Sequence, residues 1–190
     1  MSIIHTAGIQ KHSFVDGEGI RFVIFTQGCI HACPSCHNPE TWACEGGTAL
    51  DTSELIAEML ATRFLDGITL SGGDPLLQAE ASFEIARAAR EAGLNVWMYT
   101  GWTWEALLQG KVPHVSAEEA REGLSFIDVL VDGRFIASRA YEHPADEAGV
   151  PYWRGSSNQR LIDVPKSLRA GQIVGYVPDT QDRESVPQVS

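Results

Sequence analysis

The chain has 190 residues, of which 44% are hydrophobic and 21% charged, and this composition is typical of a soluble globular protein with one core. The 25 acidic residues outnumber the 14 basic ones and give a net charge of −11, which argues against nucleic acid or an anionic membrane as the main partner. No apolar run reaches ~18 residues and the first residues do not resemble a secretion signal, so we expect a cytoplasmic protein.

The first strongly apolar segment, residues 20–25, predicts a buried strand that leads directly into a loop rich in cysteine. Asp51 predicts the N-cap of the helix that follows this loop, with Glu54 as its capping-box partner. The apolar face of that helix is expected to consist of Leu55, Ile56, Met59, Leu60 and Phe64.

The rest of the chain alternates strand and helix patterns. We predict strands over 67–70, 94–99 and 126–131, a helix over 76–91, and one short helix within the connection 110–123. Such alternation builds right-handed βαβ units, so the sequence predicts an α/β fold with a parallel sheet. We expect a single domain over residues 1–178 and a disordered polar tail over residues 179–190.

Four unusual loops each follow a predicted strand. They are the cysteine loop, Gly72-Gly73-Asp74, Thr100-Gly101 and Asp132-Gly133. Because ligands of open α/β sheets bind beyond the carboxyl ends of the strands, these loops predict one active site at that edge.

Three cysteines, Cys29, Cys33 and Cys36, form the compact pattern C-x3-C-x2-C. Thiolates are soft ligands that favour iron–sulfur clusters, zinc or copper. A cubane cluster held by three cysteines leaves one iron without a protein ligand, and that iron can bind a substrate. The pattern therefore favours a catalytic iron–sulfur site.

Two interpretations without catalysis remain open at this point. A structural zinc site could be completed by Cys44, His31 or His37, and a ferredoxin-like electron carrier would need a fourth cysteine. Cys44 lies outside the compact triplet, and we expect it to be a small buried apolar residue, not a ligand.

The segments 15–21 and 27–42 resemble the radical S-adenosylmethionine enzymes that activate glycyl-radical enzymes, and the resemblance extends over about residues 13–163. Segments 127–135 and 153–160 resemble the activating proteins of anaerobic ribonucleoside-triphosphate reductase. The stretch from Cys36 to Trp42 is also similar to the activating enzymes of pyruvate formate-lyase.

The resemblance implies a short version of the radical S-adenosylmethionine fold, a partial (β/α) barrel with a curved, mostly parallel sheet. It implies a [4Fe–4S] cluster on Cys29, Cys33 and Cys36, with S-adenosylmethionine as the second cofactor. The reduced cluster is expected to split S-adenosylmethionine into methionine and a 5′-deoxyadenosyl radical, which then removes a hydrogen atom from a glycine of anaerobic ribonucleoside-triphosphate reductase. No general base is needed, and no catalytic residue is expected beyond the cluster ligands.

Partners follow from the same resemblance. Another glycyl-radical enzyme, such as pyruvate formate-lyase, is the alternative partner, and the expected reductant is a protein of the flavodoxin or ferredoxin type. The segment from Arg154 to Arg160 is expected to face the partner, with a solvated loop as the alternative interpretation. The candidates within it are Arg154, Ser156, Asn158 and Arg160.

The contacts to S-adenosylmethionine are also implied by the resemblance. Gly72-Gly73-Asp74 is similar to the Gly-Gly-Glu motif that meets the amino group, although a plain turn with Asp74 as the N-cap before Pro75 stays open. Ser35 replaces an aromatic residue that seats the adenine in many relatives, and His37 could supply a ring instead. The expected contacts are Ser35, Cys36, His37, Gly72, Gly73, Asp74, Asp132 and Arg134. For Asp132 and Arg134, a surface turn with exposed charges is the alternative.

Overall fold

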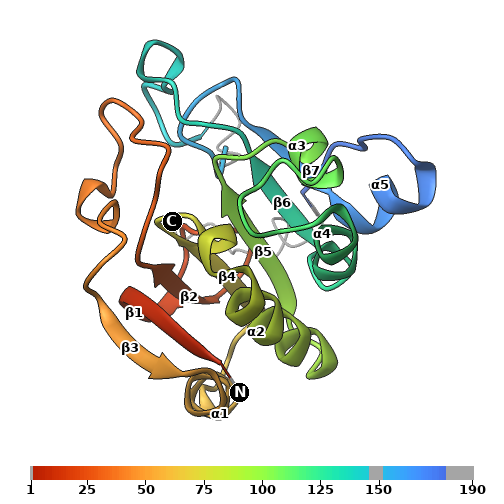
Figure 1. Ribbon diagram of the computed structural model, residues 1–190. Helices are drawn as coiled ribbons and strands as arrows, with labels where there is room; N and C mark the ends of the chain where they lie inside the picture. The colour runs from red at the N-terminus through yellow and green to blue at the C-terminus, as the bar shows by residue number, and fades with distance from the viewer. Residues whose placement is uncertain (1, 146–151, 179–190) are drawn as a thin grey trace, which may run out of the picture.

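A computed structural model describes residues 2–145 and 152–178, so the tail expected over residues 179–190 lies outside the described part. The described residues form one sheet of seven strands in the order β3-β1-β2-β4-β5-β6-β7 (Figure 1). Helices are packed against this sheet, as expected for an α/β fold. Within the described residues, no helix is long and apolar enough to cross a membrane.

Four parallel strands form the centre of the sheet. They are β2 (Arg21–Thr26), β4 (Gly67–Gly72), β5 (Asn95–Thr100) and β6 (Val129–Asp132). All four were predicted from their apolar runs, which are typical of strands buried on both faces, and the fold class is confirmed. Because the strands are parallel, the loops that follow them all leave the sheet at one edge.

Antiparallel strands flank this centre, and the sequence patterns did not predict them. They are β1 (Ile3–Ser13), β3 (Thr48–Asp51) and β7 (Arg160–Asp163). β1 pairs with both β2 and β3, and β7 pairs with β6. Buried and exposed residues alternate only near the start of β1. The rest of β1 lacks this alternation, so its sequence pattern does not indicate a strand.

The helices occupy five segments of the described chain. They are α1 (Thr52–Ala61), α2 (Ala79–Glu91), α3 (Trp104–Leu108), α4 (Ala117–Leu124) and α5 (Val164–Ala170). Short 3-10 turns occur at η1 (Pro39–Thr41), η2 (Pro75–Gln78) and η3 (Ala137–Arg139). The helix predicted over 76–91 therefore begins as η2 and continues as α2. α3 and α5 were not predicted.

The capping, the end and the buried face of the first helix differ in part from the prediction. Asp51 is the N-cap, because its carboxylate accepts a hydrogen bond from the Ser53 amide at 2.8 Å, but the predicted capping-box bond from Glu54 is not among the contacts of this cap. α1 ends at Ala61, so Phe64 falls in the loop beyond it and is 76% exposed. Leu60 is half exposed, and the buried face is formed by Leu55 and Met59.

The two faces of the sheet are filled differently. The helix-covered face holds the main apolar core, which includes Ile24, Leu70 and Met98. The other face holds Trp97 and a fully buried arginine, Arg21, whose guanidinium lies 5.3 Å from the indole of Trp97. Desolvation lowers the pKa of Arg21 to about 10, although its N–H groups donate to Thr69 and to backbone carbonyls.

A candidate site at the carboxyl edge of the sheet

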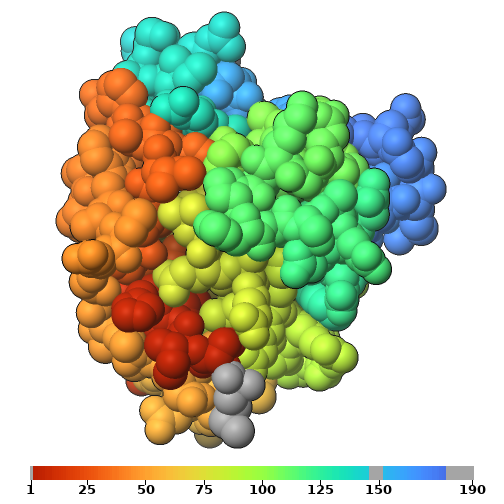
Figure 2. All heavy atoms as spheres, viewed as in Figure 1, coloured from red at the N-terminus to blue at the C-terminus, as the bar shows by residue number. Residues whose placement is uncertain are grey.

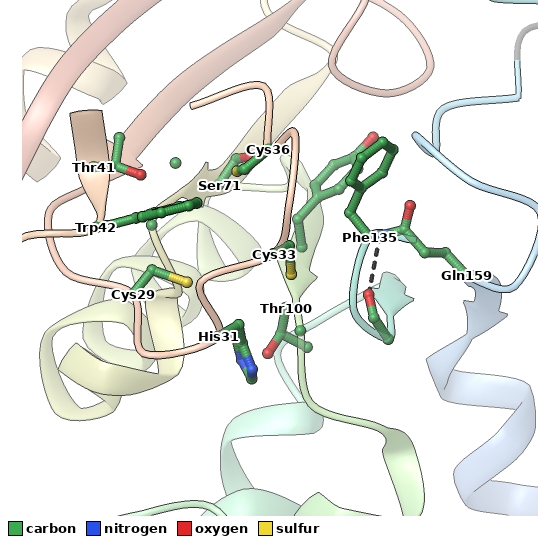
Figure 3. A pocket seen from close by; sticks show the side chains of 15 residues that line it. Cys29, His31, Cys33, Cys36, Thr41, Trp42, Ser71, Thr100, Phe135 and Gln159 are labelled. Carbon is green, nitrogen blue, oxygen red and sulfur yellow. Dashed lines mark hydrogen bonds between the residues drawn. The ribbon is translucent and has the colours of Figure 1, made fainter. Parts of the chain in front are cut away.

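The loops that follow β2, β4, β5 and β6 line a common pocket. Figure 2 shows the cysteine loop, in orange, meeting the turquoise segment that follows β6 at one end of the molecule. The lining residues are Cys29, His31, Cys33, Cys36, Thr41, Trp42, Ser71, Gly72, Gly73, Tyr99, Thr100, Gly101, Gly133, Phe135 and Gln159 (Figure 3). Segments distant in sequence thus meet at the carboxyl ends of the parallel strands, where ligands of open α/β sheets bind.

The three cysteines of the compact pattern border this pocket together. Cys33 is buried, while Cys29 and Cys36 are partly exposed. Burial raises the pKa of the Cys29 thiol, and the nearby Asp74, Cys33 and Cys36 raise this pKa further. A hydrogen bond from the backbone N–H of His31 acts in the opposite direction and lowers it. The loop turns sharply between the thiols, because Ala32 and Ser35 both have positive φ angles, of 45° and 60°.

This donor set fits an iron–sulfur cluster better than a zinc ion. Three thiols border one open pocket, whereas a structural zinc ion takes four protein ligands in a closed shell. Three thiolates on a cubane would leave its fourth iron accessible from the pocket. His37 lies against the ring of Phe135, with 5.1 Å between ring centroids, and His31 Nε2 lies 2.7 Å from the Asp74 carboxylate.

Cys44 is not among the residues that line the pocket of the triplet, although it lies beside Gly28, the residue before Cys29. It borders a different hollow, together with His5 and His114, and its side chain is exposed. The expectation that Cys44 is buried is wrong, because the bend between η1 and β3 faces solvent.

Gly72 and Gly73 bring the end of β4 against the cysteine loop. Gly72 has φ of 95°, and a Cβ at this position would lie 2.6 Å from the Cα of Phe25 on β2. A Cβ on Gly73 would overlap the carbonyl oxygen of Gly28, which also accepts a hydrogen bond from the Asp74 amide at 2.8 Å. Both glycines line the pocket, so their backbone is open to a ligand there.

Asp74 is fully buried behind these glycines. One carboxylate oxygen accepts from the Leu76 amide at 3.0 Å, and so caps η2 in the way that the turn interpretation predicted. The other oxygen meets His31 Nε2 at 2.7 Å and the Gly101 amide at 3.0 Å. Thr100 donates its hydroxyl to the same carboxylate. In this structure the Asp74 carboxylate is saturated by the chain itself.

Asp132, at the end of β6, is also buried and paired. Its carboxylate accepts from the Trp104 amide at 2.7 Å and from the guanidinium of Arg160, with 2.8 Å to Nε. Arg160 additionally binds Glu105, and this cation lowers the pKa of Glu105 to about 2. Arg134 is exposed, and it donates to the carbonyl oxygen of His31 in the cysteine loop.

The side chains of the segment from Arg154 to Arg160 make hydrogen bonds within the chain. Ser156 is buried and accepts from the Ile136 amide, and Asn158 donates to the Arg134 carbonyl. Arg154 donates to the Tyr141 hydroxyl at 3.1 Å. Each of the four candidates of this segment therefore holds a contact within the chain, and the residue of the segment that lines the pocket is Gln159.

Sequence reasoning assigned no role to several residues that line the pocket. Gln159 donates to the Gly133 carbonyl at 3.0 Å, and its amide oxygen accepts from the Gly155 amide (Figure 3). Phe135 and Trp42 supply the aromatic surface that Ser35 lacks. Ser35 and His37 lie near the triplet but are not among the lining residues. Spacing alone gives no indication of Phe135 or Gln159, since both are positioned by long-range contacts.

Comparison with known proteins adds independent information. Residues 15–162 match the family model described as a 4Fe-4S single cluster domain. The chain is 33% identical over 158 residues to the anaerobic ribonucleoside-triphosphate reductase-activating protein of Enterobacteria phage T4, covering 78% of this chain and 86% of that protein. It is 41% identical over 100 residues to the pyruvate formate-lyase-activating enzyme of Clostridium pasteurianum, covering 50% of this chain and 41% of that enzyme. Among solved structures, QueE from Escherichia coli matches with 14% identity and a TM-score of 0.41 over 53% of each chain.

Proposed function

The chain belongs to the 4Fe-4S single cluster domain family and to the anaerobic ribonucleoside-triphosphate reductase-activating proteins, and from this we propose that it installs a glycyl radical on an anaerobic ribonucleoside-triphosphate reductase. It is a radical S-adenosylmethionine enzyme, and its cofactors are a [4Fe–4S] cluster and S-adenosylmethionine. The observation that supports the proposal most is the shared pocket of three thiols and four strand ends.

Cys29, Cys33 and Cys36 are the residues that would hold the cluster. When bound, the cluster supplies the electron that cleaves S-adenosylmethionine and so starts hydrogen removal from the partner's glycine. The chain's own work is to hold these thiols in one pocket and to limit water around them. The buried Cys33 and the aromatic side chains of Trp42 and Phe135 serve the second task.

We propose that S-adenosylmethionine contacts the backbone of Gly72 and Gly73 at the end of β4, where no side chain intervenes. Ser35, Cys36 and His37 stay assigned to the other side of the ligand. Asp74 and Asp132 support the site from behind, because their buried carboxylates fix the strand ends that line it. Arg134 is the exposed cation at this edge and suits the ligand's carboxylate.

We propose that the partner approaches the segment from Arg154 to Arg160, of which Gln159 lines the pocket. Its role toward the partner is indirect, since its hydrogen bonds shape the rim of the pocket. We assign the reductant to a flavodoxin- or ferredoxin-type protein, because a single electron has to be delivered to a cluster of low potential. The acidic chain suits neither nucleic acid nor an anionic membrane as a partner.

The partner is tested by mixing the reduced, cluster-loaded protein and S-adenosylmethionine with an anaerobic ribonucleoside-triphosphate reductase. Electron paramagnetic resonance is expected to record a glycyl radical on the reductase, together with release of 5′-deoxyadenosine. A parallel mixture with pyruvate formate-lyase is the control, since the similarity to its activating enzyme covers half of this chain. A glycyl radical that forms only on the lyase would overturn the choice of partner.

A further inference from the structure

The interior of the cysteine loop makes few hydrogen bonds with the rest of the molecule. Among the hydrogen bonds described for residues 30–35, the two that reach other parts of the chain both involve His31. Its Nε2 lies 2.7 Å from Asp74 Oδ2, and its carbonyl oxygen accepts from the guanidinium of Arg134. Because Cys29 and Cys33 lie two residues to either side, the position of His31 sets the course of the chain between two cluster ligands.

His31 occupies a slot formed by the ends of β4 and β5 (Figure 3). Its side chain is only 8% exposed, and its ring meets Trp102 edge to face, with 4.9 Å between ring centroids. Gly101 forms the floor of the slot, because a Cβ at this position would overlap the imidazole. The absence of a side chain at position 101 therefore makes room for His31.

Asp74 is a rigid acceptor for this ring. Its carboxylate is fully buried and is fixed by the Leu76 amide, the Thr100 hydroxyl and the Gly101 amide, which come from two different strand ends. A carboxylate held by several donors keeps its orientation, and it keeps the orientation of the group bound to it. The contact with His31 thus connects the cysteine loop to the ends of β4 and β5.

We propose that His31 is a positioning residue: the Asp74 carboxylate and the slot above Gly101 hold its imidazole, and this fixes the cysteine loop so that the three thiols face one cluster. The statement about the cluster rests on the proposed function, whereas the contact itself concerns the chain alone. Outer partners of this kind orient metal ligands without binding the metal.

The first test uses the full chain before cluster reconstitution and follows amide hydrogen exchange in peptides that contain residues 29–36. We expect His31→Ala and Asp74→Asn to speed exchange there, and the double variant to exchange no faster than Asp74→Asn alone, since that variant has already lost the contact with His31. His31→Gln should restore part of the protection, because its amide can donate to Asp74. The matched control is His12→Ala, which removes an exposed histidine bonded to the Arg63 carbonyl.

The second test uses the reconstituted protein and measures iron loss to a chelator. His31→Ala and Asp74→Asn should each lose iron faster than the unaltered protein and bind it roughly 10- to 100-fold more weakly, the range found for outer-shell partners of metal sites. The spectrum of the reduced cluster, recorded with and without S-adenosylmethionine, separates this role from ligand binding. His31→Ala should still show the change on adding S-adenosylmethionine for the fraction of protein that keeps its cluster.

Two results would overturn the proposal. One is unchanged exchange of residues 29–36 in His31→Ala. The other is an Asp74→Asn variant that keeps its iron and its exchange rates but no longer responds to S-adenosylmethionine, because Asp74 would then act on the ligand and not on His31. If the unaltered chain takes up no iron at all, the proposed function fails, and the exchange experiment still decides whether the contact holds the loop.

Discussion

The pocket has two walls that are built in different ways. The wall of β6 and β7, with residues 132–135 and 154–160, is tied together by side chains such as Arg160, Gln159 and Asn158. The cysteine loop on the other side has backbone bonds at its ends, where Gly28 and Cys29 donate to the carbonyls of Thr41 and Trp42. Between these ends, residues 30–35 depend on His31.

This difference indicates which wall depends on the bound cofactor for its stability. The polar side chains of the β6 and β7 wall bond to one another and to backbone groups, so most of its polar groups already have partners without a ligand, the buried Oδ1 of Asn158 excepted. A loop with positive φ angles at Ala32 and Ser35 and few hydrogen bonds lacks that support. Binding energy from cluster ligation would supply it, since metal binding couples to local folding. The following predictions test this difference between the two walls.

The largest effect is expected from the loss of one cluster ligand. Replacing Cys29, Cys33 or Cys36 by Ala should abolish both iron retention and the formation of 5′-deoxyadenosine, because the cluster would keep only two thiolates. Iron analysis and product chromatography measure the two losses. Hydrogen exchange should rise in residues 29–36 and stay unchanged in 154–160; equal loosening of both walls would contradict the contrast.

The next effect concerns the self-supporting wall. Arg160→Ala leaves the buried carboxylate of Asp132 without its cation and should lower the free energy of unfolding by about 3 kcal/mol. Urea unfolding measures this change. The matched control is Glu105→Gln, which removes only the exposed half of the same network and should cost at most about 1 kcal/mol. Equal losses in both variants would show that the burial of Asp132 does not matter.

A smaller effect is expected from acid. The ion pair with Arg160 lowers the pKa of Glu105 from 4.5 to about 2, so the folded state binds this proton less readily than the unfolded state. The pair therefore stabilises the fold above pH ~4.5, and this stabilisation is lost as the pH falls towards 2. Its size is limited because both side chains are partly exposed. Unfolding curves between pH 5 and 2 should fall less steeply for Glu105→Gln; parallel curves would contradict the assignment.

The smallest effect is expected at Cys44. Cys44→Ala should keep the iron content and the rate of S-adenosylmethionine cleavage of the unaltered protein, since this exposed thiol borders another hollow. The measurements are the same as for the three ligands. Loss of the cluster in this variant would show that four cysteines are needed and that no iron is left open for the substrate.

The sequence predicted the central strands and the candidate ligand edge for clear physical reasons. Buried parallel strands carry continuous apolar runs, and the glycines after β4 are visible as a turn pattern. The flanking strands β1, β3 and β7 carry mixed residues, and their pairing is decided by long-range contacts.

The same limit applies within the site. Cys29, Cys33 and Cys36 are local in sequence, so their spacing indicated a shared ligand role. The partner of Asp74 could not be read in this way, because His31 is 43 residues away and the slot depends on Gly101. For Cys44, a preference for burial gave the wrong environment, since the shape of one bend decides its exposure.

The most direct test of the central claim is an analysis of iron, acid-labile sulfide and zinc in the protein purified without oxygen, combined with electron paramagnetic resonance after reduction. Iron and sulfide in equal amounts, with a reduced-cluster spectrum that changes when S-adenosylmethionine is added, are the results expected for three thiolates and one open iron. Zinc without iron and sulfide, or a cluster spectrum that S-adenosylmethionine leaves unchanged, would contradict the account.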